Sequence, residues 1–297
     1  MTLPRPWALL AATLILTTVV FGAPADYAPP LHDALVAGLL AASLVLAWFA
    51  GGRVLAGTDG PRRLQAAAAL LLVAPFALFA LVPGVGPPRI QPPQDNALRF
   101  LLLAIDGVVL GVGLYALKEA LAAAGERLFA PLGAAAFGIA GPLYVVFGLI
   151  QHVDYVAMVH GWSWAASVDG TRRELTPLDA LSMAALFIAG ALAWIAVVAF
   201  ARALRRAGWL GGAAAATLQV IGTLGLGFLL ARGLAYPSLG AAFSHWYTIP
   251  GFVAGVPATA WMPLCAIGVL LLRRLDREAP QAALNPPAPG AARSATT

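Results

Sequence analysis

Residues 32–50 of the chain read HDALVAGLLAASLVLAWFA, and residues 178–196 read LDALSMAALFIAGALAWIA. Each stretch is an apolar run of about 20 residues, the length that an α-helix needs to cross the hydrocarbon core of a bilayer. Each has an aspartate near its start, Asp33 or Asp179, and a tryptophan near its end, Trp48 or Trp194. The two stretches predict membrane-spanning helices, and their likeness predicts that one half of the chain repeats the other.

The composition extends this prediction to the whole chain. Hydrophobic residues make up 61% of the sequence, charged residues 10%, and the mean hydropathy is +0.84, whereas about a quarter of a soluble domain is charged. Eight apolar runs are long enough to cross a bilayer, at about 7–23, 31–50, 64–83, 98–118, 128–150, 178–201, 209–232 and 249–272. We therefore expect an all-α polytopic membrane protein with eight transmembrane helices, whose main partner is the lipid bilayer. The connecting segments are too short to hold a catalytic domain.

The basic residues predict the orientation of these helices. The net charge is +5, but the basic residues stand at helix ends in small groups, so we expect no nucleic-acid partner. If the N-terminus is cytoplasmic, the inner side carries thirteen basic residues: Arg5, Arg53, Arg62, Arg63, Lys118, Arg127, Arg202, Arg205, Arg206, Arg273, Arg274, Arg277 and Arg293. The outer side carries five: Arg89, Arg99, Arg172, Arg173 and Arg232. This asymmetry predicts both termini in the cytoplasm, in a plasma (inner) membrane.

The first apolar run has a second interpretation. It follows a basic start and precedes Ala23-Pro24-Ala25, a sequence that a signal peptidase could cleave. Cleavage would leave seven helices and an outward N-terminus. We favour retention, because the internal repeat needs this helix. The single cysteine, Cys265, excludes an intrachain disulfide.

An offset of 146 residues aligns the two halves of the chain. It matches Asp33 with Asp179 and Trp48 with Trp194, and it brings AAAALLLV at 66–73 close to AAAATLQV at 213–220. The first and fifth runs share VVFG, at 19–22 and 145–148. We therefore predict a 4+4 tandem repeat, with the first four-helix unit at 1–127 and the second at 128–276. Residues 277–297 have few bulky apolar side chains and predict a disordered cytoplasmic tail.

Asp106 is the only ionisable residue well inside an apolar run. A carboxylate at such depth costs several kcal/mol unless it is protonated, paired or facing water. It follows Arg99 by seven residues, about 10 Å along a helix. Asp106 could therefore be a structural hydrogen-bond acceptor that reaches another helix or Arg99. It could equally bind and release a proton or a cation.

Other polar residues have both a structural and a functional interpretation. Asp33 and Asp179 fall where carboxylates stabilise helix N-termini, or they could flank an entrance between the halves. Gln219 lies among threonines and glycines and could contribute to a polar interior. Pro257 and Pro263 predict that the last helix is kinked or broken, as in helices that line transporter cavities.

All four histidines fall on the predicted outer side. His152, Asp154 and His160 follow one another near the end of the fifth run, and His245 and His32 lie in or near other outer loops. Imidazole and carboxylate groups bind zinc and other first-row metals, and imidazole binds haem iron. The spacing matches no known metal motif, however, and histidines are also common where helices meet lipid headgroups.

Three classes of function remain open from the sequence. The first is a transporter or permease with a protonatable site at Asp106 and an unknown small-molecule substrate. The second is a sensory, structural or assembly module without chemistry of its own, which needs no cofactor. The third is a membrane redox enzyme that holds a metal or haem in the outward histidine cluster. The sequence indicates no oligomeric state.

Overall fold

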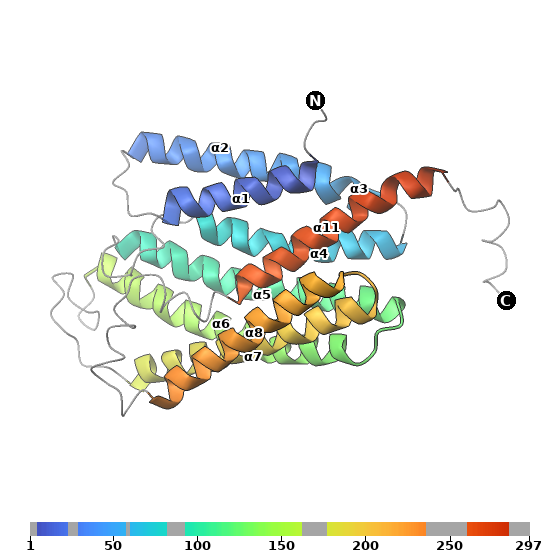
Figure 1. Cartoon of the computed structure of the whole chain (residues 1–297). Coiled ribbons are helices and arrows are strands. Elements are labelled where there is room, and N and C mark those ends of the chain that lie inside the picture. The colour runs from blue at the N-terminus through green and yellow to red at the C-terminus, as the bar shows by residue number, and fades with distance from the viewer. Residues whose placement is uncertain are drawn as a thin grey trace, which may run out of the picture.

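The computed structural model describes residues 5–22, 29–57, 60–81, 93–161, 177–235 and 260–284, and these residues contain helices and short connections but no strand. In chain order the elements are α1 (Pro6–Gly22), α2 (Pro29–Ala47), the π-helical turn η1 (Trp48–Gly52), α3 (Arg53–Ala56), α4 (Gly60–Leu81), α5 (Pro93–Ala123), α6 (Phe129–Val159), α7 (Pro177–Arg206), α8 (Gly212–Ala235) and α11 (Trp261–Leu284). Figure 1 shows most of them side by side along one shared direction. The prediction of an all-α protein is confirmed.

Five helices of the described chain are long and apolar enough to cross a membrane: Ala37–Ala56, Asn96–Ala123, Phe129–Val159, Ala184–Arg206 and Gly212–Leu230. Their outward faces carry large exposed apolar side chains, including Leu44, Ile105, Leu132, Ile188 and Leu224. Such a surface is unfavourable in water and favourable in lipid. The fold therefore supports a multi-pass membrane protein with at least part of the predicted set of spans.

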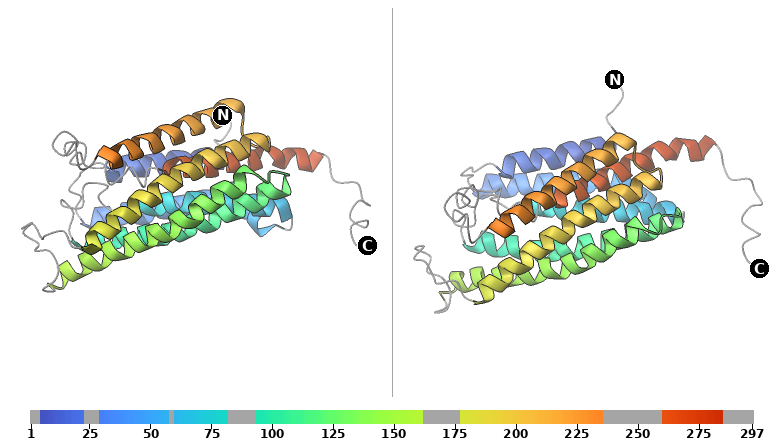
Figure 2. Two further views of the ribbon diagram at one scale, coloured as in Figure 1. Left: turned by 90° about the horizontal axis from the view of Figure 1, so that it is seen from below. Right: turned by 60° about the horizontal axis from the view of Figure 1, so that its bottom comes forward.

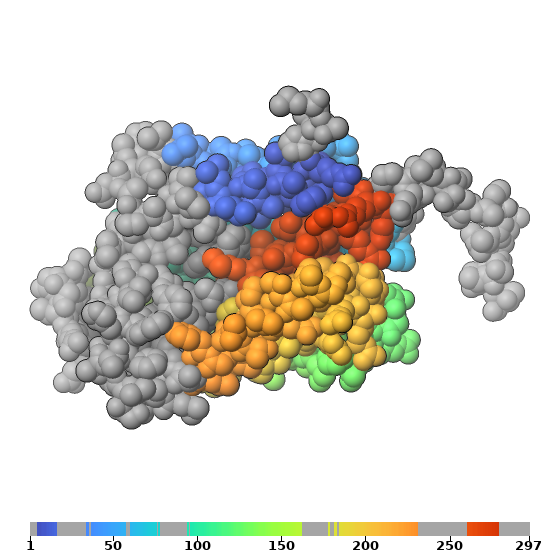
Figure 3. Space-filling model, viewed as in Figure 1, coloured from blue at the N-terminus to red at the C-terminus, as the bar shows by residue number. Residues whose placement is uncertain are grey.

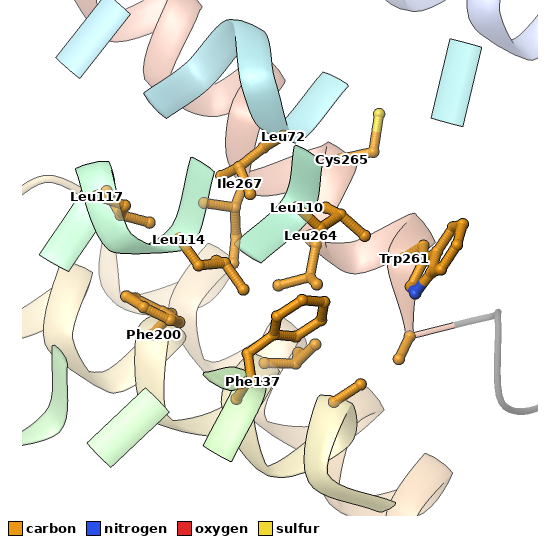
Figure 4. Packing of buried hydrophobic residues seen from close by; sticks show 14 of the residues in the cluster. Leu72, Leu110, Leu114, Leu117, Phe137, Phe200, Trp261, Leu264, Cys265 and Ile267 are labelled. Atoms are coloured by element: carbon orange, nitrogen blue, oxygen red, sulfur yellow. The ribbon is translucent and has the colours of Figure 1, made fainter. Parts of the chain in front are cut away.

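The helices pack in an order that places α5 between α4 and α6. α5 packs against α4 and α6, α6 packs against α7, and α7 packs against α8. α11 crosses the bundle obliquely against α4, between α1 and α8, and its last turns project past the other helices (Figures 1, 2 and 3). In the core, Leu110 and Leu114 of α5 meet Phe137 of α6 and Leu264 and Ile267 of α11 (Figure 4).

Two predicted helix ends were wrong. The fifth run was predicted to end at residue 150, but α6 continues to Val159. The polar side chains of Gln151, His152 and Asp154 lower the local hydropathy, although intervening valines keep the helix apolar enough to continue. These residues therefore lie on a helix and not in a loop.

The last helix also differs from the prediction. α11 begins at Trp261, so Pro263 lies in its first turn, where the missing N–H would have had no intrahelical acceptor. Pro263 therefore causes no break, and Pro257 lies outside the described residues. α11 ends at Leu284, so its last turns include the first residues of the segment predicted as a tail. Proline does occur inside two other helices, at Pro75 of α4 and Pro142 of α6.

The packing of the two predicted four-helix units is not equivalent. α4 packs along α5, whereas its predicted counterpart α8 packs mainly on α7 and only marginally on α11. Trp48 is half exposed, while its counterpart Trp194 is buried. The arrangement of the described helices does not test whether the chain arose by duplication, and the 4+4 repeat stays a prediction.

Candidate functional site

Asp106 lies near the middle of the 31-residue helix α5. It has no exposed surface, and neither carboxyl oxygen has a hydrogen-bond partner in the described part of the chain. Both structural interpretations of Asp106 required a partner, on another helix or at Arg99. The observed geometry gives it neither, and a carboxyl that is buried without a partner lowers stability. Asp106 is therefore the strongest candidate for a functional group in the bundle.

The face of α5 that carries Asp106 is directed toward α4. Asp106 precedes Gly113 by seven residues, about two helical turns, so the two residues share a face. A Cβ atom at Gly113 would lie 2.9 Å from Cβ of Leu71 in α4. One turn along α4, Pro75 has no N–H group to donate to the Leu71 carbonyl. Asp106 thus faces a helix whose hydrogen-bond ladder is interrupted.

On its other side, α5 approaches α6 at backbone distance. A Cβ atom at Gly107 would lie 3.1 Å from Cβ of Tyr144 and 3.2 Å from the Gly141 carbonyl oxygen. Tyr144 is fully buried, and its ring packs edge-on against Trp261, with 5.2 Å between ring centroids. Two large aromatic side chains with polar atoms therefore lie at the junction of α5, α6 and α11. Sequence analysis missed Tyr144, because an isolated tyrosine in an apolar run has no distinctive spacing.

Arg99 and Gln219 differ in their relation to Asp106. Arg99 is buried, 7% exposed, and lies seven residues before Asp106 on the same face of α5. Gln219 lies on α8, which packs on α7 and α11 and has no extensive contact with α5. Its side-chain nitrogen is buried without a hydrogen-bond partner in the described residues. The structure therefore places Gln219 apart from the Asp106 site.

Asp33 and Asp179 lie near the starts of α2 and α7, as predicted. Asp179 is the third residue of α7, and Asp33 is the fifth residue of α2. Both positions are helical, but their side chains lie outside the described part of the structure. Their proposed roles at helix ends or at an entrance are not tested.

The histidine cluster does not form a metal site in the described residues. No group of three or more His, Cys, Asp or Glu side chains there is placed to hold a metal ion. His152 Nδ1 lies 2.8 Å from the Ala97 carbonyl and donates a hydrogen bond to it, which joins α6 to the start of α5. Asp154 is two residues farther along the same helix and therefore points to the opposite side. His160 caps the C-terminus of α6. His245 and the His32 side chain lie outside the described residues.

Neighbouring contacts give the His152 region a structural role. Gln151 Nε2 donates a hydrogen bond to Ser182 Oγ of α7 at 3.4 Å. Tyr155 stacks on Phe100, with 5.5 Å between ring centroids. Together with the His152 bond, these contacts hold α5, α6 and α7 together at the helix ends opposite the α5–α6 connection.

Basic side chains gather at the opposite end of the bundle, around the α5–α6 and α7–α8 connections. Several stack on aromatic rings, with Arg53 4.2 Å from the centroid of Phe49 and Arg274 4.4 Å from that of Trp209. Arginine–aromatic pairs of this kind suit the boundary between lipid and water. Such pairs hold several basic side chains of the described helices at this end of the bundle.

Glu126 organises this basic end. Its side chain is buried, and one carboxylate oxygen accepts hydrogen bonds from the N–H groups of Leu128 and Phe129, both at 2.8 Å. The other oxygen lies 3.0 Å from Nε of Arg206. Burial raises the pKa of Glu126, but the two N–H groups and the Arg206 guanidinium outweigh it, so that its pKa is lowered overall. Glu126 is thus an anionic cap for α6 and a link to α7.

Comparison with protein families, curated proteins and solved structures gave no significant match. The class of protein therefore rests on the fold and the site alone. The described part of the chain is all-helical, has several helices suited to a membrane, and holds the unpaired Asp106 carboxyl deep in the bundle.

Proposed function

We propose that this chain is a transporter- or permease-like membrane protein in which Asp106 takes up and releases a proton or a cation. The observation that carries the proposal is the complete burial of Asp106 with both carboxyl oxygens unpaired. Ionisable residues inside membrane-spanning helices are costly and rare, and those that occur commonly lie on proton or ion pathways.

The surroundings of Asp106 support the proposal. Pro75 removes one N–H group from the hydrogen-bond ladder of α4, the helix toward which the Asp106 face of α5 is directed, and interrupted helices are common in transporters. Gly107 and Gly141 bring α5 and α6 together at backbone distance. Small residues at such a contact let the two helix backbones approach closely, as is common between membrane helices.

We propose further that all eight long helices cross the membrane, that both termini are cytoplasmic, and that the membrane is the plasma (inner) membrane. The basic residues at the α5–α6 and α7–α8 end support this orientation. The matched Asp and Trp positions support the 4+4 duplication. A Cys265→Ala background with single cysteines at Arg127→Cys and Arg173→Cys tests the orientation. An impermeant maleimide added to intact cells should label position 173 and not position 127.

A flux measurement tests the function. Full-length protein is reconstituted in liposomes that contain a pH-sensitive dye, and a membrane potential is imposed. We expect proton entry above that of protein-free vesicles, with at least a tenfold loss in Asp106→Asn and little loss in the control Asp154→Asn. Wild-type flux equal to that of empty vesicles, or unchanged flux in Asp106→Asn, would overturn the proposal and favour a structural or sensory module.

Elemental analysis by mass spectrometry distinguishes the transporter proposal from the remaining alternative, a metal- or haem-binding enzyme. The proposal expects no near-stoichiometric iron, copper or zinc in the purified chain. Bound metal that disappears in His152→Ala would instead favour a redox or metal enzyme at the outer histidines.

A further inference from the structure

A cavity of about 500 Å³ lies at the basic end of the bundle, away from Asp106. One wall is the turn between α7 and α8, with Gly208, Trp209, Leu210 and Gly211. The other is a face of α11, whose lining residues are Leu270, Arg273, Arg274, Arg277 and Glu278. These α11 residues recur every three or four positions and therefore form one stripe.

Charge in the cavity is strongly positive. Three guanidinium groups face one carboxylate, that of Glu278, which already pairs with Arg274 at 2.6 Å. The cavity is thus left with two positive charges in excess. A concentrated positive field in a partly enclosed site attracts anions.

The arginines are held with donor groups still available. The Arg274 guanidinium stacks 4.4 Å from the Trp209 ring centroid, and that of Arg273 lies 5.3 Å from the ring centroid of Trp7. Stacking occupies the flat face of a guanidinium and leaves its N–H edges for hydrogen bonding.

The backbone adds further donors. Gly211 and Ala214 line the cavity at the start of the 24-residue helix α8. The N–H groups of the first helical turn have no intrahelical acceptor and favour anions. Gly208 adopts a φ of +69° and ends α7 in a tight turn that presents Trp209 to Arg274.

We infer that this cavity binds a phosphate group, and that the phosphate is the headgroup of an anionic phospholipid. Arginine forks and helix N-termini both match phosphate geometry. The cavity lies at the ends of membrane helices, where lipid headgroups reside, and basic pockets between such helices bind phospholipid headgroups.

Lipid titration of the full-length protein in neutral detergent tests this inference. The affinities for phosphatidylglycerol and phosphatidylcholine are measured by native mass spectrometry, and each variant is first checked for an unchanged thermal midpoint. We expect phosphatidylglycerol to bind at least tenfold more tightly. Arg274→Gln combined with Arg277→Gln should remove that preference, while the control Arg205→Gln, an exposed arginine at the same end, should retain it within about threefold.

A second pair of variants leaves every charge in place. A Cβ atom at Gly211 or at Gly212 meets nothing within 4 Å, but only Gly211 lines the cavity. Gly211→Leu should obstruct the cavity and abolish the preference for phosphatidylglycerol, whereas Gly212→Leu should keep it. Equal loss in both variants, or no lipid preference in the wild-type chain, would overturn the inference.

Inorganic phosphate distinguishes the source of the phosphate. If it raises the thermal midpoint of the wild-type chain but not of Gly211→Leu, while phosphatidylglycerol shows no preference, the lipid assignment is refuted. The flux through Asp106 is measured separately, so failure of one proposal does not imply failure of the other.

Discussion

Replacement of Asp106 by valine should stabilise the protein. Asp106 is fully buried with two unpaired oxygens, and a buried unsatisfied polar group costs about 1–3 kcal/mol. Valine removes the polar atoms and is only slightly larger, so that overpacking offsets part of the gain. We expect a net stabilisation of about 1–2 kcal/mol, which corresponds to a rise of roughly 2–8 °C in Tm for a large chain.

Tryptophan fluorescence during heating in a neutral detergent measures this change, because the chain has eight tryptophans. The reverse substitution is the matched control. Leu110 is fully buried one turn farther along α5, and Leu110→Asp should destabilise the chain by about 3 kcal/mol or more. A fall of Tm in Asp106→Val would refute the reasoning, since it would show that the carboxyl makes a stabilising contact.

Two further predictions concern helix contacts. Gly107→Ala should destabilise the chain by about 1–3 kcal/mol, because its Cβ would lie 3.1 Å from Tyr144 Cβ. Gly111→Ala should change stability by less than about 1 kcal/mol, since nothing lies within 4 Å of a Cβ at Gly111. Equal Tm values for the two variants would contradict this account of the α5–α6 contact. Glu126→Gln should cost about 1–3 kcal/mol. The pKa of Glu126 is lower in the folded chain than in the unfolded chain. The ionised side chain therefore contributes its full stabilisation at a pH above the unfolded pKa of about 4.3, and this stabilisation is lost as the pH falls through the folded pKa. A wild-type minus Glu126→Gln difference in Tm that stays constant in acid would contradict that assignment.

Hydropathy was sufficient to predict the all-helical class and several helices of membrane-spanning length, because bilayer thickness fixes the length of each apolar run. It failed at helix ends. His152 and Asp154 lie on α6, since a helix continues through polar residues when its neighbours still favour it. Pro263 was expected to interrupt a helix but lies in the first turn of α11, whose start at Trp261 cannot be read from composition.

The candidate site was predicted only in part. Asp106 could be identified from sequence, because one carboxyl in a long apolar run is unusual. The approach of Tyr144 to Gly107 and the proline inside α4 could not be related to Asp106 from sequence, because only packing brings α4, α5 and α6 together. Gln219 is also a polar residue within an apolar run, and only the packing of α8 on α7 shows that it lies apart from Asp106.

Infrared difference spectroscopy of the reconstituted protein tests the central claim most directly. The carbonyl stretch of protonated carboxyl groups is followed while pH is stepped between about 5 and 9. The account predicts a reversible, pH-dependent band that is absent from Asp106→Asn and present in Asp154→Asn. A spectrum in which Asp106→Asn removes no pH-dependent band would contradict the claim that Asp106 exchanges a proton.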